Sequence, residues 1–318
     1  MQIQIIHAIL LICVFCTSCC TPDCNTIEPH ISYCTPTRLV ERLPSPFTPL
    51  SPSERAQDWG KELALGRAFS KELDLYRALT CFKRAQFLIP AKERQRKTEI
   101  EYDIFFAYYV GNKFEDALEI FENGELAYAD ANFPAYNDLL IAVYDAYMQI
   151  DEPDKAYRIM CLISMINQEV STKLELESAF LEANIPLMEQ IAENVPFSDS
   201  IFGFVANYSC NAKSIQKART LNTVFPGAGY WYVGQKKTAV TSFIINALFI
   251  AAAYQLFDRG YIAGGLILTS LETGWYFGGI NGAGLAAKEY NEHLYNCLAK
   301  ETMVQNRLFP ILMIERGF

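Results

Sequence analysis

The chain has 318 residues, of which 51% are hydrophobic and 20% are charged, and its formal net charge is −9 at pH 7. This length leaves room for two domains with separate cores. The negative net charge argues against nucleic acid as the main partner, because recognition of DNA and RNA depends on basic surfaces.

An apolar segment, Ile3 to Phe15, opens the chain. It is shorter than the roughly 20 residues of a membrane-spanning helix, which is typical of the core of a secretory signal. The following sequence, Phe15-Cys16-Thr17-Ser18-Cys19-Cys20, resembles a bacterial lipobox, in which a cysteine receives a diacylglycerol. We therefore expect a signal peptide over 1–18 and lipid attachment at Cys19. Cleavage without lipidation and retention as an uncleaved anchor are the alternatives.

The sequence lacks the residue patterns of a catalytic or metal site. Six of the ten cysteines lie in the first 34 residues, where crowding indicates lipidation or an oxidising compartment. The three histidines, at positions 7, 30 and 293, lie far apart, and the chain has no phosphate-binding loop, nucleophile elbow or HExxH motif. We expect no enzymatic activity, no cofactor and no bound metal.

A proline-rich segment links the signal to the rest of the chain. The five prolines between 36 and 52 exclude a helix and a central strand there. We expect 19–52 to hold the lipid attachment site and an extended tether, of up to about 3.1 Å per residue, that keeps a domain away from a bilayer. A disordered linker is the alternative. A helix start follows at Ser51-Pro52-Ser53-Glu54, with a capping serine, a proline at the first helical position and a glutamate at the third.

Small and aromatic residues recur at a fixed spacing in the middle of the chain. Alanine recurs at positions 78, 117 and 156, a constant step of 39. In the first unit, seven positions match the tetratricopeptide repeat: Leu65, Gly66, Phe69, Ala78, Phe82, Ala85 and Pro90. The region from about 57 to 165 thus resembles a tetratricopeptide array with about five extra residues in each unit, because the usual step is about 34.

The resemblance implies a solenoid of helix pairs over 53–195. We expect a further helix, from a Thr172-x-x-Glu175 capping box to about Glu193, to cap this stack. Tetratricopeptide arrays bind peptides in a concave groove lined by the first helix of each pair. The candidate partner-binding residues in this groove are Tyr108, Asn137, Tyr144 and Tyr147. Packing in the core is the alternative for each aromatic side chain.

Charge is segregated along these repeats. Residues 53–97 hold eleven basic and six acidic side chains, whereas residues 98–200 hold four basic and twenty-one acidic ones. Segregation on this scale creates potentials that steer a partner, and an acidic surface that faces a partner would select a basic one. A solvated surface that keeps the solenoid soluble is the alternative.

The C-terminal third indicates a membrane unit. No acidic residue occurs from Ile201 to Phe257, and we expect 196–220 to be a basic juxtamembrane linker. The pattern Pro226-Gly227-x-Gly229-x-x-Tyr232-x-Gly234, followed by two hydrophobic segments, resembles a family of small bacterial transmembrane-hairpin domains over about 219–291. The family brings no catalytic residues. We expect 221–235 to form a re-entrant or interfacial turn, because its proline and glycines break helices and its aromatic residues favour an interface.

Two segments after this motif form the expected transmembrane hairpin, within a unit that covers 221–290. Ala239 to Phe257 is uncharged, and its 19 residues span about 28 Å as a helix. Tyr261 to about Ile280 forms the return helix, and 291–318 is a tail. Small residues form a stripe at Gly260 and Gly264 and again at Gly274, Gly278, Gly282 and Ala286. Such stripes let helix backbones touch, within one chain or between two copies of it.

One carboxylate, Glu272, interrupts the return helix. Residues of equal depth in a hairpin that turns at 258–260 have numbers that sum to about 518, which pairs Glu272 with Asn246. We expect a hydrogen bond between these two side chains at the midplane, with Glu272 protonated. A contact between copies and a transport pathway are the alternatives.

Together these features predict an all-α protein: a tetratricopeptide-like helical solenoid followed by a transmembrane helical hairpin. We expect a membrane-anchored scaffold of the bacterial envelope that binds membrane lipid and a protein or peptide partner. A small channel or an insertion factor is the alternative. Helical spans favour the inner membrane, and the export signal places the repeats in the periplasm. The basic residues that flank the hairpin then lie on the periplasmic side, whereas the positive-inside rule favours basic residues on the cytoplasmic side.

Overall fold

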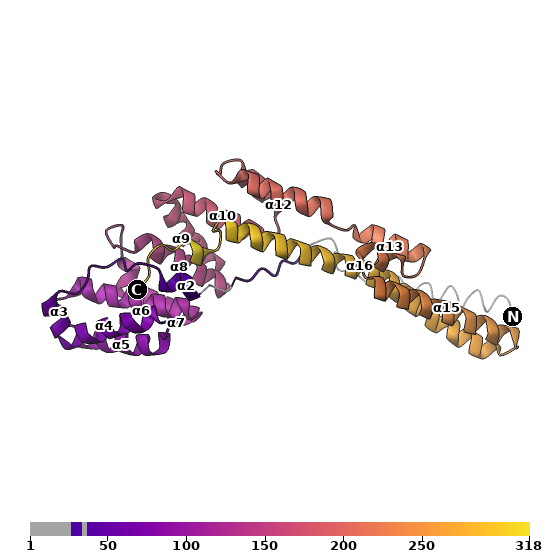
Figure 1. Ribbon diagram of the computed structural model, residues 1–318, viewed down its shortest axis with the longest axis horizontal. Coiled ribbons are helices and arrows are strands. Elements are labelled where there is room, and N and C mark those ends of the chain that lie inside the picture. Colours follow the sequence, from indigo (N-terminus) through magenta and orange to yellow (C-terminus); the bar gives the residue numbers. More distant parts are fainter. Residues whose placement is uncertain (1–26, 34–36) are drawn as a thin grey trace. The chain divides into compact units, whose positions relative to one another are not determined.

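The computed structural model describes residues 27–33 and 37–318, and the regular secondary structure in these ranges is helical, without strands (Figure 1). The all-α prediction is therefore confirmed for this part of the chain. Two compact units are present. Unit 1 is described by residues 27–30 and 205–298, and unit 2 by residues 31–33, 37–204 and 299–318. The expected lipid attachment site, Cys19, and the signal peptide lie outside the described residues.

Most helices of unit 2 are short and follow one another closely along the chain. They are α2 (Thr37–Glu41), α3 (Pro52–Ala56), α4 (Asp58–Lys71), α5 (Leu75–Leu88), α6 (Arg94–Val110), α7 (Phe114–Asn123), the 3-10 helix η1 (Glu125–Tyr128), α8 (Tyr136–Gln149), α9 (Pro153–Ile166), α10 (Gln168–Leu181), α11 (Ile185–Ala192) and α17 (Pro310–Met313). Unit 1 contains α13 (Ile215–Val224), α14 (Ala228–Val233) and α15 (Lys236–Asp258). The boundaries between the units fall within α12 (Ser198–Asn211) and α16 (Ile262–Gln305).

The helices α4 to α11 form successive hairpins. Each of them packs on the next along the chain, and α6 also contacts α4 and α8. The first hairpin is preceded by the expected capping box: Glu54 N donates to Ser51 Oγ at 3.3 Å, and Ser51 N donates to Glu54 Oε2 at 2.7 Å. Stacking of hairpins buries the apolar face that each helix would expose alone.

The 39-residue period of the sequence is also a period of the backbone. The turns inside the first three hairpins each contain a residue with positive φ: Leu73 (55°), Asn112 (55°) and Asp151 (60°). These positions are 39 residues apart, the same step that separates the three alanines. Ala78, Ala117 and Ala156 are each at most 1% exposed, which allows the two helices of a pair to lie close together. The repeat is therefore expressed in both turn geometry and packing.

A fourth hairpin stands where a single capping helix was expected. The prediction of one helix from Thr172 to Glu193 is wrong, because α10 ends at Leu181 and Ala183 adopts a positive φ of 53°. Asn184 then begins α11 by accepting from Leu187 N at 3.2 Å. Thr172 lies inside α10, where its hydroxyl donates to a carbonyl one turn earlier. The N-cap of α10 is instead Asn167, which accepts from Val170 N at 3.2 Å. Two asparagine caps thus define two helices.

The end of the proline-rich segment packs on unit 2, contrary to the expected extended tether over 19–52. Val40 and Phe47 are buried, and the Phe47 ring contacts the rings of Tyr102 at 5.4 Å and Phe133 at 5.7 Å. The expected absence of a helix between 36 and 52 is also wrong, because the short helix α2 fits between Pro36 and Pro44. The prolines likewise do not prevent burial of the apolar side chains between them. This part of the segment therefore belongs to the core of unit 2.

Arg96 holds this segment in place. Its guanidinium donates to the carbonyl of Thr48 at 2.9 Å, to Glu54 Oε1 at 2.9 Å and to Glu99 Oε2 at 2.6 Å. Hydrogen bonds from Arg96 and Ser51 lower the pKa of Glu54 to about 2. Arg96 is part of a basic cluster at 92–97, but its charge is satisfied inside the unit and is not displayed to a partner.

The C-terminal residues are also ordered, although 291–318 was expected to be a tail. The return helix was expected to end at about 280, but α16 continues to Gln305. Beyond it, Glu315 N donates to Asp138 Oδ1 at 2.7 Å, and the Phe318 ring lies 5.0 Å from that of Phe106. Burial of apolar side chains such as Phe318, which is 4% exposed, stabilises this arrangement.

Unit 1 is built around a small core where α13, α14 and α16 meet. Ala218, Val233, Ala286 and Ala287 form this core. The basic linker expected over 196–220 is instead mostly helical, because it contains α12 and the first half of α13. α15 and the first part of α16 follow one another as two long helices (Figure 1).

Candidate functional site

The Pro226–Gly234 motif forms a compact turn between α13 and α15. Gly227 has a φ of 93° and precedes α14, and Gly234 has a φ of 98° and ends it. Residues other than glycine rarely adopt this conformation. A Cβ at Gly227 would also clash with the backbone carbonyl of Ala239, in the first turns of α15. The segment 221–235 is therefore broken into two short helices, as its composition predicts.

Gly229 has a different role from the one expected. It lies inside α14, and a Cβ there would clash with the carbonyl of Ala218 and with Ala283. Gly229 therefore permits the close approach of α14 to α13 and α16, whereas Gly227 and Gly234 provide the bends.

Asn222 completes the turn and was not identified from the sequence. Its side-chain oxygen accepts from Gly227 N at 2.8 Å, and the residue is 2% exposed. The hydrogen bond satisfies the backbone donor at the tightest point of the turn. An asparagine in an otherwise apolar run before Pro-Gly was the available signal, but the sequence does not show which donor it meets.

We expect Asn222→Ala to lower the free energy of unfolding of the full chain by about 1–3 kcal/mol, because it leaves the buried N–H of Gly227 unpaired. Chemical unfolding in detergent measures this change. The control is Asn207→Ala, since Asn207 is exposed on α12. Equal stabilities for the two variants would contradict the role given to Asn222.

Basic side chains surround Tyr232. Its hydroxyl accepts from Ser214 N at 3.1 Å, and the ammonium groups of Lys213 and Lys217 lie 5.4 and 5.0 Å from its ring centroid. Lys236 similarly lies 6.0 Å from the ring of Trp231. Cation–π contacts of this kind hold the ammonium groups beside the motif. The basic residues of the expected linker are thus part of a folded turn.

The glycine stripe meets α15 at Gly264, where a Cβ would lie 3.6 Å from Leu256 Cδ1, but not farther along α16. A Cβ at Gly274 or Gly278 would meet no atom of the described chain within 4 Å beyond its own helix backbone. Gly282 instead makes room for the hydroxyl of Tyr230, and Ala286 lies in the core of unit 1. Contact between two copies through the stripe stays a prediction.

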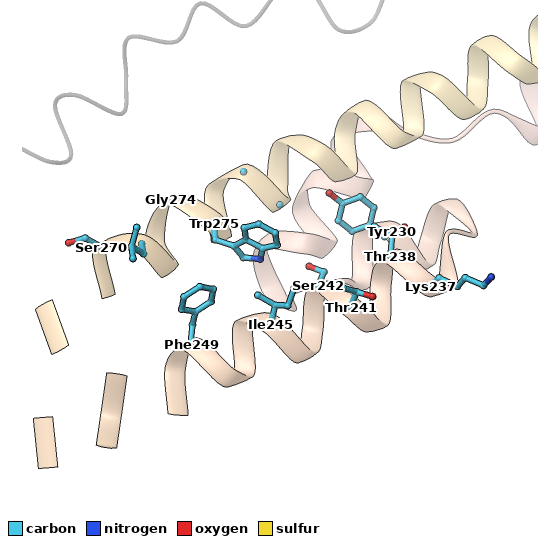
Figure 2. Close-up of a pocket in the computed structure, with 13 residues that line it drawn as sticks. Tyr230, Lys237, Thr238, Thr241, Ser242, Ile245, Phe249, Ser270, Gly274 and Trp275 are labelled. Carbon is cyan, nitrogen blue, oxygen red and sulfur yellow. The ribbon is translucent and has the colours of Figure 1, made fainter. Parts of the chain in front are cut away.

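A groove of about 920 Å³ lies between α15 and α16 beside these open glycines. Figure 2 shows side chains from both helices around it. Hydroxyl groups line one part of it, from Tyr230, Thr238, Thr241 and Ser242, while Ile245, Phe249 and Trp275 supply apolar walls. The groove is therefore amphipathic, and Lys237 provides a positive charge at its polar end.

The expected hydrogen bond between Asn246 and Glu272 is not formed. Asn246 Nδ2 donates to the carbonyl of Ser242 at 2.6 Å, one turn earlier in α15. Its buried Oδ1 has no hydrogen-bond partner among the described residues, and Glu272 is half-buried. The Nδ2 group is thus engaged within its own helix while Oδ1 is unpaired, and the predicted hydrogen bond to Glu272 is wrong for this structure.

The four candidate partner-binding residues of unit 2 have different surroundings. Tyr108 accepts from Lys83 Nζ on α5 at 2.6 Å, and Tyr147 donates to Glu122 on α7 at 2.8 Å. Tyr144 and Tyr147 are at most 5% exposed, and Asn137 is half-buried with an unpaired Oδ1 in the described structure. Packing within the unit thus accounts for Tyr144 and Tyr147, and a binding role for the four residues stays a prediction.

Large apolar side chains are instead exposed on the second helices of two hairpins. Tyr76 and Phe87 of α5 are 83% and 89% exposed, and Tyr157 and Met165 of α9 are 69% and 81% exposed. Their exposure could not be predicted from the sequence, because amphipathic periodicity does not distinguish an exposed aromatic from a buried one. Exposed apolar groups of this size mark candidate contact surfaces.

No family model, curated protein or solved structure matches the chain. The resemblance to tetratricopeptide repeats and to transmembrane-hairpin domains therefore rests on the sequence motifs alone and stays a prediction. Among the described residues, no group of three or more His, Cys, Asp or Glu side chains could hold a metal ion.

Proposed function

We propose that the chain is a membrane-anchored scaffold, in which α15 inserts into a bilayer and the helical hairpins of unit 2 bind a protein or peptide. The observation that carries this proposal is the exposure of large apolar side chains along α15. Those on α15 are Val240, Phe243, Ile244, Leu248, Ile250, Tyr254 and Phe257. A water-soluble helix would bury such residues, and only lipid or another protein covers them without cost.

The dimensions of α15 support insertion. Its 23 residues span about 34 Å as a helix, more than the roughly 30 Å of a hydrocarbon core. It is the one described helix that is long and apolar enough to cross a membrane by length and composition, and only 17% of its most apolar window is buried. We propose that the first part of α16, from Ile262 to about 280, returns through the bilayer beside it.

The turn at the start of α15 suits the lipid–water interface. Trp231, Tyr232 and the lysines that contact them combine aromatic rings with positive charge. Aromatic residues favour this zone, and lysines near it attract anionic headgroups. We place the protein in the inner membrane of a bacterial envelope, anchored further by lipidation at Cys19, with unit 2 in the periplasm.

The hairpins of unit 2 support partner binding. Their regular step and their small residues at the helix crossings are typical of tetratricopeptide-like solenoids, which bind peptides and proteins. The C-terminal residues already pack on α6 and α8, so the exposed aromatic side chains of α5 and α9 are the surface that we assign to the partner.

Site-specific photo-crosslinking in intact cells tests this assignment. A benzophenone side chain at Tyr157 is expected to yield a discrete crosslink to another protein in the membrane fraction. The same group at Tyr128, which is 89% exposed on η1 and lies outside this surface, serves as the matched control and is expected to yield none. Absence of a crosslink from both Tyr157 and Phe87 would contradict partner binding by this surface.

The groove between α15 and α16 favours a second candidate function, a small membrane channel or an insertion factor. Its hydroxyl groups, such as Thr241 and Ser242, offer polar contacts within an apolar helix pair. Ion flux through vesicles that contain the purified chain tests the channel. Flux that Thr241→Val abolishes would favour it over the scaffold.

A further inference from the structure

A cavity in unit 2 has walls that suit a positively charged ligand. Its volume is about 470 Å³, and it lies between α6, α8, α10 and the residues before α17. Asn112 and Met148 are exposed at its rim, so the cavity opens to solvent. None of the residues that line it is Lys, Arg or His.

Two carboxylates face this cavity from different helices. Asp145 of α8 accepts hydrogen bonds from the hydroxyl of Tyr109 at 2.6 Å and from Gln149 Nε2 at 3.1 Å. Glu177 of α10 is only 6% exposed. Within the part of the chain that the structure describes, its carboxylate has no hydrogen-bond or ion-pair partner.

A buried carboxylate without a partner is unusual in a folded protein. Charged groups are rarely buried unless a counter-charge or several donors compensate the loss of water. Burial and the nearby charge of Asp145 raise the pKa of Glu177 well above its ordinary value. A cation in the cavity would supply the missing counter-charge to both side chains.

The remaining walls favour an organic cation over a metal ion. Three aromatic residues, Tyr33, Tyr109 and Phe309, line the cavity, and Tyr33 stacks on Phe309 with 4.6 Å between ring centroids. Aromatic faces attract ammonium groups and accommodate the alkyl chain that carries them. Metal sites in proteins need more ligands than two carboxylates supply, and no group of three His, Cys, Asp or Glu side chains is present in the described ranges.

We propose that this cavity binds an alkylammonium group between Asp145 and Glu177. The group comes either from a lysine side chain of the protein partner or from a free primary amine. The alternative of a partner lysine rests on the proposed function. In that case the cavity would give the scaffold a preference for a basic partner. The abundance of acidic residues over 98–200 is consistent with attraction of such a ligand toward the cavity.

Calorimetric titration of the purified full chain in detergent tests the proposal. The probes are pentylamine, N-acetyl-lysine methylamide and, as the neutral analogue of equal length, 1-pentanol. We expect saturable binding of at least one amine, no comparable binding of pentanol, and a loss of at least tenfold in affinity in both Glu177→Gln and Asp145→Asn. Tighter binding of the lysine derivative assigns the site to a partner, and tighter binding of pentylamine assigns it to a free amine.

The matched control is Glu175→Gln, which removes an exposed carboxylate two residues away on the same helix and is expected to leave affinity unchanged. The thermal unfolding of each variant shows that a loss of binding is not a loss of structure. Equal binding of pentanol, undiminished binding to Glu177→Gln, or no binding of either amine would overturn the proposal. Alkali extraction of the same chain tests membrane insertion separately. Failure of the amine-binding proposal can therefore be distinguished from failure of the membrane-anchored function.

Discussion

Leu248→Lys is expected to release the protein from membranes that retain the parent chain. Leu248 lies near the middle of α15 and is 63% exposed, so in a bilayer its side chain would face lipid. The substitution leaves the core of unit 1 unchanged, because the residue is not part of it. Its effect therefore reports on the surroundings of the helix.

The expected effect is large. On scales of helix insertion, leucine at a helix centre favours the membrane slightly, whereas lysine opposes it, and the difference is roughly 3–4 kcal/mol. A change of this size shifts the insertion equilibrium on the order of a hundredfold or more. Alkaline carbonate extraction measures the change as the fraction of protein left in the membrane pellet.

The matched control is Phe87→Lys, which places the same charge on an exposed apolar position of α5 in unit 2. We expect this variant to stay in the pellet with the parent chain. If both lysine variants are extracted equally, or if the parent chain itself is released by alkali, α15 does not insert and the membrane-anchored function is wrong. The parent chain and both lysine variants all carry Cys19→Ser, because lipidation at Cys19 would otherwise retain each of them in the pellet.

Gly227→Ala is expected to destabilise the protein more strongly than Gly234→Ala, the other substitution in the turn motif at a positive φ. The backbone at Gly227 has a φ of 93°, which costs about 1–2 kcal/mol for a residue with a Cβ. The added Cβ would also clash with the carbonyl of Ala239, and overpacking against backbone costs about 1–3 kcal/mol more. Together the two contributions lower the free energy of unfolding by roughly 2–5 kcal/mol. Relaxation relieves little of this cost, because neither the Cβ nor the carbonyl can move without shifting α14 or α15.

Gly234→Ala separates the two contributions. Its φ of 98° carries the same strain, but a Cβ there would meet no atom within 4 Å. We expect it to lower stability by only about 1–2 kcal/mol. Gly203→Ala, on α12 in open space and without a positive φ, should be neutral or slightly stabilising.

Thermal unfolding of the three variants in detergent ranks them. The expected order of unfolding temperature is Gly203→Ala highest, Gly234→Ala intermediate and Gly227→Ala lowest. Equal unfolding temperatures of Gly227→Ala and Gly234→Ala would show that the backbone at Ala239 moves away from the added Cβ without measurable cost. The close packing of Gly227 against Ala239 would then not contribute to stability.

The local features of this protein were determined by its sequence. The step between Ala78, Ala117 and Ala156 predicted the period of the hairpins, and the Ser51–Glu54 capping box forms as expected. The uncharged run from Ala239 to Phe257 predicted most of α15, which begins three residues earlier and ends one residue later. These features are readable because helix caps, helical periodicity and apolar runs depend on residues near one another in the chain.

Tertiary structure decided which surfaces those elements meet. Phe47 and Phe318 are apolar in the sequence, but only the fold shows that they pack on Tyr102 and Phe106 and that the segments carrying them are neither tether nor tail. Likewise, Asp145 and Glu177 face one cavity although 32 positions separate them. The residue type indicates that a side chain is stabilised by burial or by a counter-charge. Which residue provides the contact depends on how distant segments pack in the fold. This is why the helices were predictable and the cavity was not.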